Sequence, residues 1–240
     1  MKIKNILAGG CSFTQNGVGG IPPTVEALGG NSFREDIEFT AAEPMSWASF
    51  LAKKIDPDSF TNVAVSGHGN VATNKVVCDM LKKFAYRPDN TLIVFNVSSV
   101  DRLDVVCEYD KGEFSKPPWG NDIIDYSFLK PRGSEWKQQL LDTTIEVIEQ
   151  QSVDSLYQLF DYLTKFEYPF VFTLMKDYTD LSVIQQYRDH LVPMPGNGMY
   201  EFCKGINGLS NDKFHPSTNG HQAVAELAYN FIHKKYNIGE

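Results

Sequence analysis

The stretch that decides the fold is Ile3-Lys4-Asn5-Ile6-Leu7-Ala8-Gly9-Gly10-Cys11-Ser12-Phe13-Thr14, in which a short apolar run meets a glycine turn. A short apolar run that ends at glycine is typical of a buried strand, so residues 3–8 are predicted to form one. Similar runs predict four further strands, the last of them short, at residues 61–65, 91–97, 170–175 and 190–194.

Between these runs, apolar residues recur at the three-to-four spacing of amphipathic helices. The expected helices cover residues 45–55, 71–86, 135–166 (one helix or two in series), 181–190 and a last segment that includes residues 223–232. Strands that alternate with such helices predict an α/β fold with a parallel sheet covered on both faces. No linker divides the chain, so we expect a single domain over residues 1–240 with insertions near 15–44 and 101–133.

The composition excludes some classes of protein. The chain has 240 residues, with 30 acidic and 22 basic side chains and a formal charge of −8. A general nucleic-acid binder needs a basic surface to displace the counterions of phosphates, so this balance argues against one. No stretch approaches the roughly 18–20 apolar residues of a membrane span, and the N-terminal apolar part is too short for a signal peptide. We therefore expect no nucleic-acid partner, no membrane span and a cytoplasmic location.

The cysteines and histidines do not indicate a metal site. Cys11, Cys78, Cys107 and Cys203 lack the CxxC spacing of a zinc site or a disulfide framework, and they are predicted to be reduced thiols. No further ligands accompany the histidines near the C-terminus. We expect neither a metal nor a cofactor.

Two patterns place chemistry at the strand ends, where ligands bind in open parallel sheets. Ser12 follows the first strand in a glycine turn, and Asp212-Lys213-Phe214-His215 precedes the last helix. A serine nucleophile needs a base, and the base needs a carboxylate that fixes its tautomer. Asp212 can face Nδ1 of His215 and leave Nε2 for Ser12. Taken singly, Ser12 is better explained as a helix cap, and Asp212 and His215 are better explained as parts of a solvated loop.

Together these patterns resemble the SGNH/GDSL hydrolase family. Its first motif is similar to residues 10–14 here, its second to residues 62–67 and its last to residues 212–215. The resemblance covers the chain from residue 1 to 240 outside the two insertions. It implies a flavodoxin-like, three-layer α/β/α sandwich of about five parallel strands, and ester hydrolysis by a serine without a metal. Short chains with Gly-Cys-Ser-Phe-Thr near their start, as at residues 10–14 here, also resemble phage-encoded members of the family.

The family also implies an oxyanion hole made of the Ser12 and Gly67 backbone N–H groups and an asparagine side chain after the third strand. The sequence departs from the family at Cys11, where the family has aspartate, and at the third motif, Gly-x-Asn-Asp. Counted along the strand, Ser98 falls where the family has its asparagine, and Asn96 comes two residues earlier. Asn96 is the predicted third donor, because residues two apart on a strand point to the same face. Ser98 or a water is the alternative, and Asn96 is otherwise a buried polar residue bonded to a neighbouring loop.

Three functions remain open at this stage. The leading one is a serine hydrolase of the SGNH esterase type, acting on a small acylated or glycan ester, with acyl or acetyl groups on a carbohydrate as one candidate. The second is a flavin or nucleotide binder, because Ser12 to Gly17 resembles a flavodoxin phosphate loop. The third is a non-catalytic binding or structural module, such as part of a virion, which the altered third motif favours. An oligomer or a virion assembly stays open.

Overall fold

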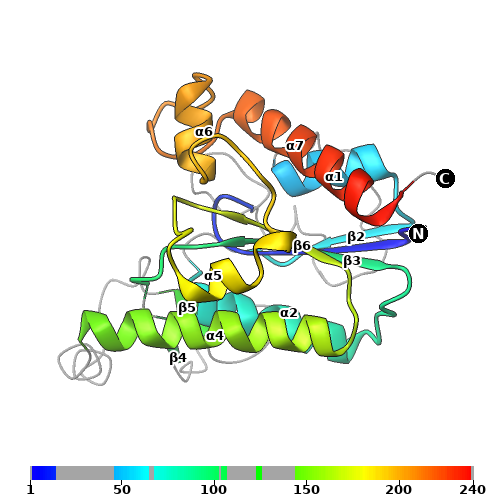
Figure 1. The fold of residues 1–240 in the computed structure, drawn as a ribbon, viewed down its shortest axis with the longest axis horizontal. Coiled ribbons are helices and arrows are strands. Elements are labelled where there is room, and N and C mark those ends of the chain that lie inside the picture. The colour runs from blue at the N-terminus through cyan, green and yellow to red at the C-terminus, as the bar shows by residue number, and fades with distance from the viewer. Residues whose placement is uncertain are drawn as a thin grey trace, which may run out of the picture.

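A sheet of four parallel strands forms the centre of the molecule. In the computed structural model, which describes residues 2–14, 46–64, 68–102, 104–106, 123–125 and 144–238, their order is β2-β1-β3-β6. The strands span Asn5–Gly9 (β1), Ser59–Asn62 (β2), Thr91–Val97 (β3) and Phe170–Leu174 (β6). Because all neighbouring pairs are parallel, the four carboxyl ends meet at one edge of the sheet (Figure 1).

Helices cover both faces of this sheet (Figure 1). One side carries α1 (Trp47–Ile55), α6 (Met199–Gly205) and α7 (Thr218–Tyr236). The other side carries α2 (Asn70–Lys83), α4 (Ile145–Lys165) and α5 (Ser182–Gln186). The predicted three-layer α/β/α sandwich is confirmed, and the order of the first three strands is that of flavodoxin-like sheets.

The side chains of β3 alternate between two apolar layers. Leu92 and Val94 belong to the core on the side of α1 and α7, whereas Ile93, Phe95 and Val97 belong to the core on the side of α2 and α4. Every residue of β3 is buried. A strand that is buried on both faces needs apolar side chains in both directions, which explains why its sequence is almost continuously apolar.

The predicted fifth strand is reduced to a single point of pairing. Leu191 forms an isolated parallel bridge with Phe172, and the N–H of Val192 donates to the Phe172 carbonyl at 2.9 Å. The pairing with β6 is not continued as a strand beyond this point. The predicted helix at 181–190 is divided into α5 and a short 3-10 helix at Arg188–His190.

The two predicted insertions are only partly described. Residues 15–44 lie outside the described residues, and so do residues 135–143 of the predicted long helix. Within 101–133, which we expected to be irregular, β4 (Asp104–Val106) and β5 (Ile123–Asp125) form an antiparallel pair. The single-domain division remains a prediction. In the described parts of the chain, no helix combines the length and apolarity that a bilayer crossing requires.

A buried histidine joins the first and last helices. Nδ1 of His221 accepts a hydrogen bond from the backbone N–H of Trp47, 3.2 Å away. A ring nitrogen accepts only when it is unprotonated, so the fold uses the neutral form. Burial lowers the pKa of His221 to about 4, and the nearby His215 lowers it too.

We expect the free energy of unfolding to fall as the pH drops from about 6.5 to about 4, because His221 takes up a proton on unfolding. Its contribution is complete above the unfolded pKa of about 6.5 and is lost progressively down to the folded value. The loss should be on the order of 2 kcal/mol between about pH 7.5 and 4.5. Urea unfolding of the wild type and of His221→Gln measures it, since glutamine keeps an acceptor that does not titrate.

The His221→Gln variant should lose less stability than the wild type over this pH range. Some slope should remain, because burial also lowers the pKa of His68 to about 4. An identical pH dependence in the two proteins would contradict the assignment to His221.

Candidate active site

Ser12 stands in a tight turn directly after β1. Gly10 begins this turn with a φ of +128°, and a Cβ at Gly10 would lie 3.1 Å from the backbone of Asn96 on β3. Glycine is the residue that tolerates both the positive φ and this close approach. The N–H of Thr14 then donates to the carbonyl of Cys11 at 2.9 Å, which closes the turn with Ser12 at its tip.

Two side chains hold the turn from opposite directions. Nδ2 of Asn62, at the end of β2, donates to the backbone oxygen of Thr14 at 2.8 Å. Nε1 of Trp47, at the start of α1, donates to the hydroxyl of Thr14 at 3.0 Å. Sequence reasoning missed the role of Trp47, because its position in an apolar helical pattern indicates only a core residue.

The structure brings together the three side chains that the sequence singled out. Oγ of Ser12 lies 2.9 Å from Nε2 of His215, and Nδ1 of His215 lies 2.5 Å from Oδ2 of Asp212. The loop turns at Lys213, whose φ is +59°, so that Asp212 folds back on the histidine. The histidine and aspartate side chains are 32% and 45% exposed, so a molecule from solvent can reach them.

Asp212 is organised as a permanent anion. Burial would raise its pKa, but hydrogen bonds from the Ser210 hydroxyl, from His215 and from two backbone N–H groups hold the pKa well below its usual value. The donors are the Ser210 hydroxyl at 2.6 Å and the N–H groups of Phe214 and His215, both at 2.9 Å. A carboxylate that remains charged can orient the imidazole and stabilise the imidazolium.

Aromatic rings fix the plane of His215. Its ring centroid lies 5.4 Å from that of Phe13 and 5.2 Å from that of Phe214, which stands nearly perpendicular to it. Phe13 follows Ser12, and Phe214 precedes His215. The residues next to the serine and the histidine therefore pack on the imidazole and keep Nε2 directed at Ser12.

The structure describes only some of the predicted oxyanion donors. Gly67 lies outside the described residues. Asn96 is fully buried: its Oδ1 accepts from the thiol of Cys11 at 3.1 Å, and its Nδ2 lies 3.3 Å from the hydroxyl of Thr173. Ser98 is also buried, and its N–H donates to Asn70 at 2.9 Å. Both polar ends of Asn96 have partners in the core, as its alternative interpretation expects, and its role as an oxyanion donor stays a prediction.

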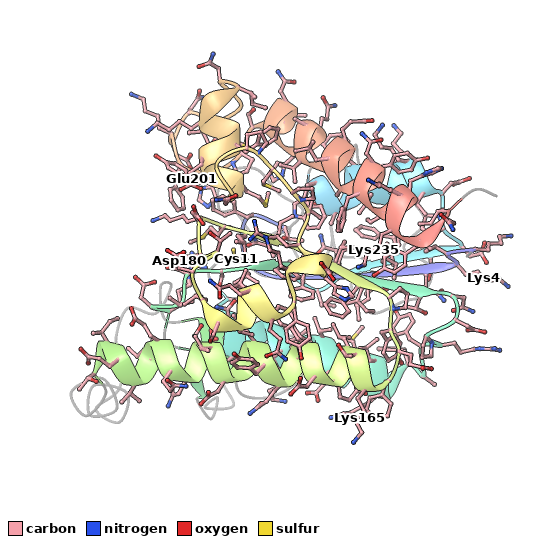
Figure 2. The ribbon with its side chains drawn as sticks, in the orientation of Figure 1. Lys4, Cys11, Lys165, Asp180, Glu201 and Lys235 are labelled. Carbon is pink, nitrogen blue, oxygen red and sulfur yellow. The ribbon has the colours of Figure 1, made fainter. Side chains whose placement is uncertain are left out.

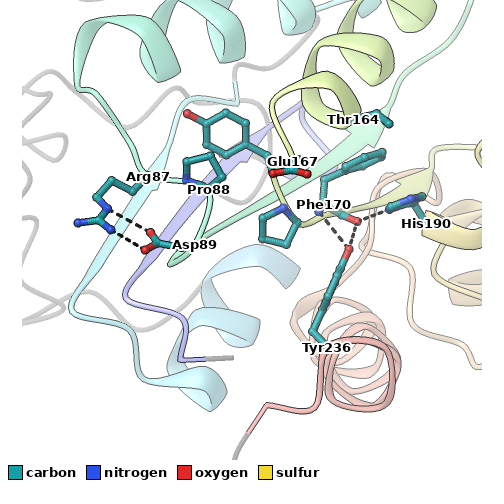
Figure 3. A pocket seen from close by; sticks show the side chains of 10 residues that line it. Arg87, Pro88, Asp89, Thr164, Glu167, Phe170, His190 and Tyr236 are labelled. Carbon is teal, nitrogen blue, oxygen red and sulfur yellow. Dashed lines mark hydrogen bonds and ion pairs between the residues drawn. The ribbon is translucent and has the colours of Figure 1, made fainter.

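A cavity of about 700 Å³ lies at the opposite edge of the sheet (Figure 3). Phe170, the first residue of β6, is at its centre. The hydroxyl of Tyr236 and Nδ1 of His190 each lie 2.9 Å from the Phe170 carbonyl oxygen.

In the described part of the chain, no three histidine, cysteine or acidic side chains gather as they would around a metal ion.

By fold, the chain is similar to solved esterase structures. The esterase EstA from Pseudoalteromonas sp., inhibited by monoethylphosphonate, has a TM-score of 0.50 and 11% identity, over 98% of this chain and 99% of that chain. Axe2, an acetyl xylan esterase from Geobacillus stearothermophilus, has a TM-score of 0.51 and 12% identity, with 97% of each chain covered. By sequence, the chain matches no protein-family model and no curated protein. The chain has the SGNH hydrolase fold.

Cys11, the residue before Ser12, is bonded across the sheet. Its thiol donates to Asn96 on β3, which donates to Thr173 on β6, and Thr173 donates to the sulfur of Met199 at 3.3 Å. This buried chain of hydrogen bonds ties the residue before Ser12 to the start of α6. Figure 2 shows Cys11 and Glu201 of α6 at the same end of the molecule, away from Lys4.

Removing Asn96, the centre of this buried series of hydrogen bonds, should destabilise the protein. Asn96→Leu is expected to lower the free energy of unfolding by about 1–3 kcal/mol, because it leaves the buried Cys11 thiol and Thr173 hydroxyl without their partner. Urea unfolding measures the effect. Asn230→Leu, on the exposed face of α7, is the matched control and should change stability by about 0.5 kcal/mol or less. Equal effects in the two variants would mean that the buried chain contributes nothing.

Proposed function

We propose that this protein is a serine hydrolase that cleaves carboxylic esters, an esterase of the SGNH type. The observation that carries the proposal is the continuous hydrogen-bonded line from Ser12 through His215 to Asp212, exposed at the carboxyl edge of the sheet. An activated serine requires a base within hydrogen-bond reach and a group that orients the base, and this geometry meets both needs.

In the proposed reaction, Oγ of Ser12 attacks the ester carbonyl while Nε2 of His215 accepts the serine proton. The tetrahedral intermediate collapses when His215 gives that proton to the oxygen of the leaving alcohol, which leaves an acyl-serine. A water molecule then attacks the acyl-serine, His215 accepts its proton, and the acid departs as the proton returns to Ser12. Asp212 remains an anion throughout and balances the charge of the imidazolium. The Ser12 and Gly67 N–H groups are the proposed oxyanion donors, with Asn96 or Ser98 as the third.

The substrate proposed is a small ester, with acylated or acetylated carbohydrate as one candidate. The acetyl xylan esterase among the structural neighbours supports that choice. The proposed cytoplasmic or virion location rests on the sequence alone, as does any assembly with other chains. A non-catalytic module is the second candidate, favoured by the engagement of Asn96 in the core. Against it, a module that only binds has no need for a serine and a histidine aligned on a carboxylate.

Ser12 should be the serine that a fluorophosphonate labels. The reagent needs a nucleophile whose proton a neighbouring base can accept, and Ser12 is 2.9 Å from His215. Mass spectrometry of the digested protein locates the adduct. Ser12→Ala should abolish labelling and ester turnover without unfolding, whereas Ser182→Ala on α5 should change neither. A folded wild-type protein without an adduct on the Ser12 peptide would favour the non-catalytic module.

Asp212→Asn should lower kcat/KM by about 100- to 10,000-fold with the fold intact, because an amide neither balances the imidazolium nor selects its tautomer. Short-chain nitrophenyl esters measure the rate. Asp58→Asn, an exposed change away from the site, is the control.

The wild-type rate should rise with pH between about pH 5 and 8, because a general base accepts a proton only in its unprotonated form. Since the pKa of Asp212 is held well below its usual value, the carboxylate adds no second step in this range. A flat pH–rate profile together with a fully active Asp212→Asn variant would remove Asp212 and His215 from the mechanism.

A further inference from the structure

Arg102 extends across the carboxyl edge of the sheet, beside the proposed catalytic residues. One terminal nitrogen of its guanidinium donates to the backbone oxygen of His68, between β2 and α2, at 3.1 Å. The other lies 3.9 Å from the sulfur of Met175, the residue that follows β6. Arg102 comes after β3, so its guanidinium links the segment before α2 with the segment after β6 at the carboxyl edge of the sheet.

The guanidinium has no carboxylate partner among the described residues. The guanidinium contacts two neutral atoms, the backbone oxygen of His68 and the sulfur of Met175. The ion pairs found among the described residues involve other side chains. The two acids nearest in sequence are engaged elsewhere. Asp101 accepts from the Ser99 hydroxyl, and Asp104 accepts from two backbone N–H groups at the start of α2, both at 2.8 Å.

The positive charge acts on the residue next to the nucleophile. Burial raises the pKa of the Cys11 thiol, and the charge of Arg102 opposes that rise. Burial, with a further contribution from the charge of Arg102, lowers the pKa of His68 to about 4. Among the described residues, no acidic side chain acts on either group. Burial raises the pKa of the neighbouring Tyr178, Asp101 and Glu201 add to that rise and Arg102 opposes it, so acids as well as Arg102 act at this part of the edge.

A second cation stands on the other side of Met175. Nζ of Lys176 lies 5.7 Å from the centre of the Phe214 ring, which packs against His215. Its neighbour Asp177 is occupied by hydrogen bonds from Thr179 and Asn197. One carboxylate oxygen of Glu201, Oε2, is buried beside Gly198 without a hydrogen-bond partner among the described residues. Lys176 thus lies beside a ring that packs on His215, and Glu201 is an acid of the same region.

We infer that Arg102 is a specificity-determining residue that binds a carboxylate on the substrate, so that the preferred esters are acidic ones. The inference rests on the proposed esterase function and names its substrate class. A guanidinium offers five N–H donors in a fixed fork that matches a carboxylate, and the neutral contacts of Arg102 leave several of them available. Lys176 adds a second, more flexible donor.

The test measures binding in the Ser12→Ala variant, so that it does not depend on turnover. Calorimetric titration compares 4-acetoxybenzoate with 4-acetoxybenzamide, and 3-acetoxybenzoate with its amide, at low salt. Each pair differs only in a carboxylate against a neutral amide of similar shape. We expect the acid of at least one pair to bind roughly 10- to 100-fold more tightly than its amide. The preference should shrink in 0.5 M NaCl, because the salt screens the charge.

Three further variants, each combined with Ser12→Ala, identify the residue. Arg102→Gln should abolish the preference with little effect on amide binding, and Arg102→Lys should keep part of it. Arg87→Gln removes the same charge at the opposite edge of the sheet (Figure 3) and should leave the preference unchanged.

Acid and amide that bind equally in both pairs, or that both fail to bind, would overturn the inference. A preference that survives Arg102→Gln would do the same. Failure of the proposed esterase function is seen separately, as the absence of a fluorophosphonate adduct on wild-type Ser12.

Discussion

The position of Ser12 depends on the close approach of two strands where β1 ends. Gly10 passes Asn96 of β3 with a positive φ and with space that would be tight for a Cβ, so the chain turns sharply out of the sheet one residue before the Cys11–Thr14 turn. The turn cannot move outward, because the Cys11 thiol is bonded back to Asn96. It cannot move sideways, because Asn62 and Trp47 hold Thr14. The position of the serine is therefore fixed by contacts that do not involve the histidine.

The histidine arrives from the other end of the chain, and its position depends on the same region. Trp47 begins α1 and holds Thr14 through its indole, while its backbone N–H donates to His221 at the start of α7. The loop that carries Asp212 and His215 leads directly into α7. One residue of α1 thus connects the serine turn to the helix that follows the histidine. This arrangement lets side chains 203 positions apart in sequence meet at 2.9 Å.

The sequence predicted the layers, the strands β1, β3 and β6 and the three side chains of the candidate site, because each leaves a local pattern. It placed the second strand at 61–65, whereas β2 is found at Ser59–Asn62. Strands buried on both faces are continuously apolar, and the short spacing of Asp212 and His215 suits a self-contained loop. It did not predict that the fifth strand is reduced to the bridge between Leu191 and Phe172, because strand pairing depends on the neighbouring strand as well as on the local pattern. It also missed α6, whose seven residues carry one buried pair, Met199 and Cys203, as their only helical signal. The roles of Trp47 and Arg102 depend on contacts between distant segments, which no local pattern reveals.

A crystal structure of the protein treated with a monoalkyl fluorophosphonate tests the central claim most directly. The account predicts phosphorus bonded to Oγ of Ser12, Nε2 of His215 within hydrogen-bond reach of a phosphonate oxygen, and the His215–Asp212 contact intact. The phosphonyl oxygen would also identify the oxyanion donors by direct contact. An unmodified Ser12, or a His215 ring that has left both Ser12 and Asp212 in the adduct, would contradict the account.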